Sequence, residues 1–123
     1  MIIARITNKE DFIKYYYLMK DIPLFDITPE TCLAKCLTGE FWGYLGTGGK
    51  EPVCIVIGRD YGKMAFIVGV WAKNSLKPFL SSFWAILKDQ GYTTARSSSM
   101  FDIEAYQKLL GMKKLWTVYE REL

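Results

Sequence analysis

The apolar positions at the start of the chain follow two different spacings. Residues 2–6 alternate enough to predict a first strand. A helix is expected to begin near Lys9, because Thr7 or Asn8 can cap it, and to end at Pro23. Its apolar stripe consists of Phe12, Tyr16 and Met19, which recur at intervals of four and three.

The next segment begins with a strong helix-start signal. Thr28 offers a capping hydroxyl, Pro29 occupies a first helical position that needs no N–H donor, and Gly39 can close the helix. After Gly39 the apolar spacing becomes strand-like, and Gly48-Gly49 is a hairpin signal. Three strands in antiparallel succession are therefore expected. They comprise residues 40–47, 52–58 and 63–72, with a second turn at residues 59–62.

The last third of the chain carries the strongest helical periodicity. A helix is predicted over residues 75–90, ended by Gly91. Its broad apolar face consists of Leu76, Phe79, Leu80, Phe83, Trp84 and Leu87. The remaining elements are a strand at residues 93–98, a helix at 102–110 and a final strand at 112–123. The predicted order is β-α-α-β-β-β-α-β-α-β, which is typical of a mixed α/β (α+β) sheet protein.

Length and composition indicate one domain over residues 1–123. Half of the residues are apolar, so the chain can bury a core without a metal or a disulfide. No uninterrupted apolar stretch approaches the roughly 20 residues of a membrane span, and residues 1–5 do not begin a secretory signal. We therefore expect a soluble, cytoplasmic protein with no membrane partner.

Charge and cysteine content argue against two kinds of ligand, nucleic acid and zinc. The formal net charge is +3 with acids and bases interleaved, and Lys113-Lys114 is the only adjacent basic pair, so there is no strong nucleic-acid signal. Cys32 and Cys36 share a helical face, but Cys54 is the only other thiol and histidine is absent. A zinc site would lack its usual fourth ligand, so no metal is expected and the thiols are read as packing residues; a disulfide or reactive thiol is the alternative.

The order and spacing of the elements resemble the GCN5-related N-acetyltransferase (GNAT) superfamily over nearly the whole chain. The features that carry the resemblance are the apolar strand at residues 65–71, the amphipathic helix after it, the pair Gly91-Tyr92 and the ending Leu110-Gly111-Met112. The resemblance implies a twisted mixed sheet that splays apart between its fourth and fifth strands, with acetyl-CoA as cofactor in the gap. The resemblance also implies that the pantetheine arm of acetyl-CoA lies along the backbone of Ile67, Val68, Gly69, Val70 and Trp71.

In that family a glycine-rich turn at the start of the following helix holds the pyrophosphate, because bare backbone N–H groups must converge on its oxygens. The corresponding residues 71–76 contain no glycine, and Pro78 favours a cap at Ser75 or Lys77. Asn74, Ser75 and Lys77 can offer donors and a positive charge instead. An ordinary capped helix is the alternative interpretation of this turn.

The resemblance also points to a tyrosine in the last helix that protonates the leaving thiolate. Tyr106 is the candidate, although counting back from Gly111 puts Gln107 at the matching position. Tyr106 also lies in a stripe with Ile103 and Leu110, which favours a packing role. The candidates for a general base are Asp60, Glu40 and Asp102, and the sequence does not place any of them in the gap.

Two hypotheses follow. One is an acetyl-CoA-dependent N-acetyltransferase that transfers an acyl group to an unidentified amine. The other is a non-catalytic module of the same fold that has lost acetyl-CoA binding and serves in binding or structure, for example in a virus or mobile element. Surface aromatics are expected at Trp42, Tyr44, Tyr61 and Trp71, and they suggest a homodimer or a protein partner.

Overall fold

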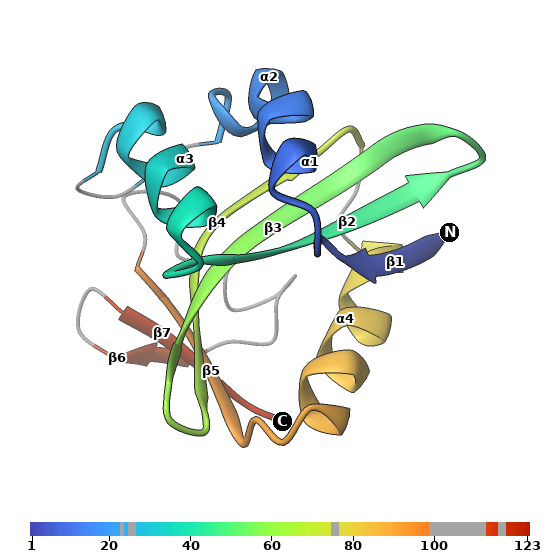
Figure 1. The fold of residues 1–123 in the computed structure, drawn as a ribbon. Helices are drawn as coiled ribbons and strands as arrows, with labels where there is room; N and C mark the ends of the chain where they lie inside the picture. The colour runs from blue at the N-terminus through green and yellow to red at the C-terminus, as the bar shows by residue number, and fades with distance from the viewer. Residues whose placement is uncertain (23, 25–26, 75–76, 99–112, 116–117) are drawn as a thin grey trace.

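A computed structural model describes residues 1–22, 24, 27–74, 77–98, 113–115 and 118–123 (Figure 1). All seven described strands belong to one sheet, in the order β1-β2-β3-β4-β5-β7-β6. The strands are β1 (Ile2–Arg5), β2 (Trp42–Gly48), β3 (Glu51–Tyr61), β4 (Met64–Ala72), β5 (Thr94–Ser98), β6 (Lys113–Leu115) and β7 (Val118–Glu122). The helices are α1 (Lys9–Lys14), α2 (Tyr16–Met19), α3 (Pro29–Thr38) and α4 (Lys77–Asp89). The predicted mixed sheet with helices is confirmed.

The helix predicted between Lys9 and Pro23 is two helices. Asn8 caps α1, its side chain accepting from the N–H of Glu10 at 3.0 Å, but the helical geometry breaks at Tyr15. Phe12 and Leu18 are both buried, although six residues of unbroken helix would turn them to different faces. The break at Tyr15 changes the direction of the helix, so that Phe12 and Leu18 can both pack toward the sheet.

Helix α3 follows its local signals closely. Thr28 Oγ1 accepts from the N–H of Thr31 at 3.1 Å, and Pro29 occupies the first helical position. Gly39 ends the helix at φ 84°, a left-handed conformation that costs glycine little. Each of these features was predicted from residues within one turn of the helix end.

The three central strands form the predicted antiparallel succession. The first hairpin turns through Gly49, whose φ is 66°, as its glycines indicated. The turn predicted at residues 59–62 is wrong, because β3 runs on to Tyr61 and the chain reverses at Gly62, with φ 59°. Asp60 belongs to the ladder and pairs with Ala65 of β4.

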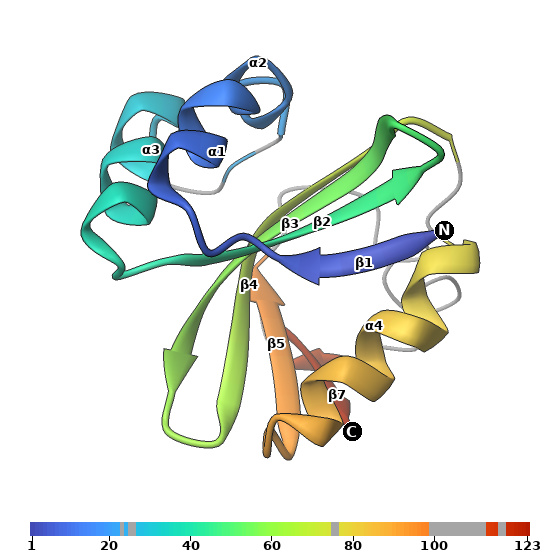
Figure 2. The same ribbon diagram turned by 45° about the vertical axis from the view of Figure 1, so that its right-hand side comes forward.

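The sheet carries a separate core on each face. Helices α1, α2 and α3 cover one face, and α4 covers the other (Figure 2). On the α4 side Trp42 and Tyr44 are 6% and 2% exposed and meet edge to face at 5.5 Å. Their prediction as surface aromatics is therefore wrong, whereas Tyr61 is 49% exposed. The broad apolar face predicted for α4 explains the difference, because it buries β2 from that side.

The end of the chain differs from the single strand predicted over residues 112–123. Strands β6 and β7 pair antiparallel, with Leu115 opposite Val118, so the chain folds back on itself. The segment has no glycine or proline to announce this reversal. Pairing with β6 satisfies backbone groups along the edge of β7 that faces away from β5. The helix predicted at residues 102–110 lies outside the described residues.

None of the described helices is long and apolar enough to cross a membrane.

Candidate functional site

The sheet divides between β4 and β5. The two strands are parallel and pair at four positions, from Met64 with Thr94 to Ile67 with Ser97. Residues 68–72 of β4 continue past this ladder, and no described residue of β5 pairs with them. The ribbons diverge beyond the ladder (Figure 1). The second half of β4 thus presents an edge of backbone N–H and C=O groups that the described residues of β5 leave unpaired.

A β-bulge lies where the division begins. Ile57 pairs with Gly69 and Gly58 pairs with Ile67, so Val68 is an extra residue on β4. A bulge bends a strand and redirects the backbone groups beside it. The bend coincides with the end of the β4–β5 ladder, so it helps to turn the free edge of β4 away from β5.

Gly69 is held against the chain segment that follows α2. A Cβ on Gly69 would lie well inside 3.0 Å of Ile22 Cγ2 and at 3.0 Å from Leu24 Cδ2. Ile22 is only 4% exposed, so its side chain has little room to move away. Glycine is therefore required at this position for close packing. The same contact fixes the segment containing Ile22 and Leu24 beside the bulge.

The other predicted residues of this strand lie along the same edge. Val68 and Trp71 pack against the core on the α1–α3 side, and Val70 packs against the α4 side. Trp71 pairs with Ile55 of β3 and is partly buried. These side chains pack into the two cores. The backbone of residues 68–71 therefore faces the opening between β4 and β5.

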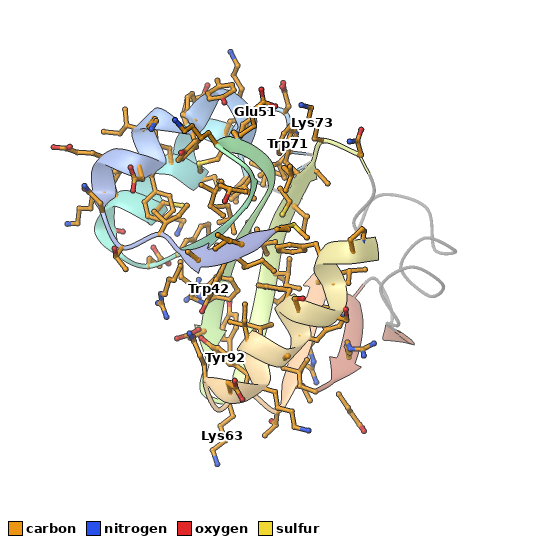
Figure 3. All side chains as sticks on the ribbon, turned by 90° about the vertical axis from the view of Figure 1, so that its right-hand side faces the viewer. Trp42, Glu51, Lys63, Trp71, Lys73 and Tyr92 are labelled. Atoms are coloured by element: carbon orange, nitrogen blue, oxygen red, sulfur yellow. The ribbon has the colours of Figure 1, made fainter. Side chains whose placement is uncertain are left out.

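The turn between β4 and α4 carries a cation that the sequence analysis did not single out. The N–H of Lys73 donates to Val53 O at 2.9 Å, and Lys73 Nζ lies 3.0 Å from Glu51 Oε2. Figure 3 shows Lys73 and Glu51 at one end of the sheet and Lys63 at the other. Lys73 could have been identified from the sequence, because it is a basic residue directly after the predicted strand.

The predicted residues of this turn are described only in part. Asn74 is exposed, whereas Ser75 and the side chain of Lys77 lie outside the described part of the chain. Helix α4 begins at Lys77, two residues later than predicted, and Pro78 is its second residue. A proline fits there because the first-turn N–H groups have no partner within the helix.

Several solved structures share the backbone path of this chain. The ribosomal-protein-S18-alanine N-acetyltransferase from Escherichia coli superposes with a TM-score of 0.74 at 11% identity, over 98% of this chain and 94% of that one. Tetrahymena GCN5 gives 0.71 at 10% identity, over 99% and 96%. A Bacillus subtilis acetyltransferase, solved in complex with CoA, gives 0.69 at 15% identity, over 98% and 97%. The chain has the GNAT fold.

Sequence comparison adds no closer relative: no family model matches the chain, and no curated protein shows significant sequence similarity to it. The GNAT fold is therefore established by the path of the backbone. At these identities the likeness does not extend to the chemistry of individual side chains.

Of the candidate acid and bases, only Glu40 and Asp60 are described, and neither lies at the open edge of this GNAT fold. Tyr106 and Asp102 lie outside the described residues. Glu40 forms surface ion pairs with Lys35 at 3.0 Å and with Arg59 at 3.3 Å. Asp60 pairs with Ala65, which lies within the β4–β5 ladder and before residues 68–72. No described carboxylate from the sequence-based candidates therefore lies along the open edge.

Asp60 instead joins a polar cluster near the end of α4. Its Oδ1 accepts from Trp42 Nε1 at 2.7 Å and from the hydroxyl of Tyr92. Burial, reinforced by the hydrogen bond to Asp60, raises the pKa of Tyr92 well above its usual range. Tyr44 donates to Gln90 Oε1 at 2.7 Å in the same region. These bonds fasten the segment after α4 to β2 and β3, which is a structural role.

The described residues contain no group of three or more His, Cys, Asp or Glu side chains that could hold a metal ion.

Proposed function

We propose that this chain is an acetyl-CoA-dependent N-acetyltransferase that acts on an amine. The observation that carries the proposal is the division of the sheet, which leaves residues 68–72 of β4 without a described partner on β5. Acetyl-CoA supplies the acetyl group as a thioester, whose carbonyl carbon forms the new bond to nitrogen while the sulfur leaves with a proton. The amine nitrogen loses a proton in the same overall exchange.

The free edge of β4 fits a slender amide-containing chain. Backbone N–H and C=O groups at Val68, Gly69 and Val70 can pair with the amides of such a chain as a strand would. An N–H near Val70 would donate to the thioester oxygen, which gains negative charge as the amine adds. The protein would thus act mainly by positioning the amine and by stabilising that oxygen.

The anionic end of the cofactor requires a different explanation here. Residues 71–76 contain no glycine, so a tight backbone cradle is not available. Lys73 and Asn74 are exposed side chains at the end of β4 and precede α4. We assign them to the pyrophosphate, together with the predicted Ser75 and Lys77. Charge and side-chain donors would replace the bare N–H groups.

The second candidate is a non-catalytic module with the same fold. The pairing of Lys73 with Glu51 favours it, because the ammonium nearest the turn already has a carboxylate partner. Under this reading the division of the sheet is an inherited feature without a ligand, and a homodimer or protein partner would provide the function. The two candidates differ in one property, which is affinity for acetyl-CoA.

Thermal unfolding with and without acetyl-CoA separates them. A ligand present at a hundred times its Kd adds about 2.7 kcal/mol to the free energy of unfolding, which raises Tm by roughly 5–10 °C for a chain of this length. CoA and 3′,5′-ADP serve as controls for the thioester and for the pantetheine arm. An unchanged Tm at millimolar acetyl-CoA would overturn the enzymatic proposal. If Tm rises, the transfer itself can be measured. The protein is incubated with acetyl-CoA and each of a panel of amines, and the free CoA thiol that is released is quantified.

A further inference from the structure

Helix α3 carries two buried thiols on one face. Cys32 and Cys36 are one helical turn apart, on the same face, and are 1% and 2% exposed. The i, i+4 spacing places the two side chains next to each other on the helix. This contact lowers the pKa of Cys32 and raises the pKa of Cys36, because the Cys36 thiol donates to the Cys32 sulfur when that sulfur is ionised. Two buried thiols therefore lie side by side on one face of α3.

A cavity of about 280 Å³ reaches Cys36, one member of this pair. Cys36 forms part of its wall, beside the aromatic residues Phe12 and Phe41. Its remaining lining comes from the end of β1, the start of α1, the end of α3 and the start of β2. The volume lies near the lower end of the range for small-molecule sites, roughly 300–1,000 Å³. The space suits a small apolar group attached to an atom that bonds sulfur.

The cavity is separate from the open edge of β4. It lies among β1, β2, α1 and α3, and β3 stands between β2 and β4 in the sheet. An inference about the thiol pair is therefore independent of the proposed acetyl transfer.

We propose that Cys32 and Cys36 form a dithiol site for soft electrophiles that bond two sulfurs at once, with trivalent aryl arsenicals as the ligand class. Two ligands are too few for a structural zinc site, which takes four. Soft centres, by contrast, prefer thiolate sulfur. The aromatic wall of the cavity would pack against the aryl group. The helical spacing places both sulfurs where a single atom can bridge them.

The reaction with phenylarsine oxide balances without an oxidant or a reductant. Each thiol exchanges its S–H bond for an S–As bond. The two protons leave with the oxygen of the arsine oxide as one molecule of water. Arsenic remains trivalent throughout. A monothiol competes poorly, because it supplies one sulfur at a time, whereas a small dithiol removes the arsenic.

The chain offers a direct readout of the bridge, because Lys35 separates the two cysteines. Trypsin cuts after Lys20, Lys35 and Lys50, so Cys32 and Cys36 fall in different peptides, residues 21–35 and 36–50. Cys54 falls in a third peptide, residues 51–59. An arsenic atom bridging Cys32 and Cys36 holds the first two peptides together in the mass spectrum, and adding 2,3-dimercaptopropanol separates them.

The experiment treats the folded full chain with equimolar phenylarsine oxide in excess glutathione. We expect one adduct by intact mass, and the linked peptides 21–35 and 36–50 after digestion. Cys32→Ala and Cys36→Ala should each lose the adduct, and Cys54→Ala is the matched control that keeps it, since Cys54 is equally buried but lies in the core on the α4 side. Circular dichroism verifies that each variant is folded.

Two results would overturn the proposal, and neither depends on the variants. One is the absence of an adduct in the folded wild-type chain. The other is an adduct whose peptides 21–35 and 36–50 separate freely on digestion.

Discussion

Gly69 and Ile22 lie so close that no methyl group fits between them. The position of a Cβ on Gly69 falls well inside 3.0 Å of Ile22 Cγ2, a separation that real Cβ atoms do not show. Gly69 follows the extra residue of the β4 bulge, and Ile22 follows α2. The contact ties the segment after α2 to the strand whose backbone is left open.

We expect Gly69→Ala to weaken both the fold and the proposed acetyl-CoA site. The added methyl group must displace Ile22 or the bulge, and such overpacking costs about 1–3 kcal/mol. Urea unfolding measures the loss of stability. If the proposed function is right, the rise in Tm caused by acetyl-CoA should also become smaller, because the backbone at the bulge has moved.

Gly49→Ala is the matched control for that change. Gly49 has open space around its Cβ position but a φ of 66°, so alanine there costs roughly 1 kcal/mol of backbone strain. It lies in the β2–β3 hairpin loop and should leave the effect of acetyl-CoA unchanged. Equal losses of acetyl-CoA response in the two variants would show that Gly69 has no special relation to the site.

Lys73→Ala should lower the affinity for acetyl-CoA with little change in stability. The Lys73–Glu51 pair is exposed, and exposed pairs contribute about 0–1 kcal/mol. Glu51→Gln should act in the opposite direction, because it removes the carboxylate that competes with the phosphates for Lys73. Titration calorimetry at low and high salt measures both effects.

Lys63→Ala provides the comparison for Lys73, because it removes the same charge at the opposite end of the sheet (Figure 3). Its effect on acetyl-CoA affinity should be small, because it changes only the net charge of the protein. An equal loss in Lys63→Ala and Lys73→Ala would assign the effect to net charge and remove Lys73 from the site.

Asp60→Ala should destabilise the protein by about 1–3 kcal/mol, because Trp42 Nε1 and the Tyr92 hydroxyl lose their shared acceptor. Asp60→Asn keeps an acceptor oxygen and should cost less. Urea unfolding followed by tryptophan fluorescence gives both values. An equally small cost for the two variants would contradict the structural role assigned to Asp60.

Cys54 should make the fold sensitive to alkaline pH. Burial raises the pKa of this thiol from 9.0 to about 11. A raised pKa in the folded state means that the stabilisation is complete below pH 9 and is lost as the pH rises through 11. The urea midpoint should therefore fall over that interval, and it should fall less in Cys54→Ala. Parallel pH profiles of the two proteins would count against this prediction.

Local signals predicted the parts of the fold that local interactions determine. The start and end of α3 follow from Thr28 and Gly39, whose side chain and backbone act within one turn. The break at Tyr15 depends on which side chains reach the sheet, and the reversal between β6 and β7 depends on strand pairing. Neither relationship is visible in a window of neighbouring residues.

The same distinction applies to the candidate site. The apolar run of β4 and its place in the fold could be predicted from the sequence and the family resemblance. The bulge at Val68 could not, because it is set by the register between β3 and β4. The need for glycine at position 69 comes from Ile22, which is remote in sequence. Lys73 could have been found, since it directly follows the strand.

The short parallel ladder between β4 and β5 has a consequence for synthesis on the ribosome. Until residues 94–97 emerge and pair with residues 64–67, the whole outer side of β4 is an ordinary sheet edge. Such an edge can recruit strands from other nascent chains. Arrival of β5 shields the first half of that edge, and no described residue of β5 pairs with the second half. The pairing that protects the first half of the edge thus also sets where the unpaired half begins.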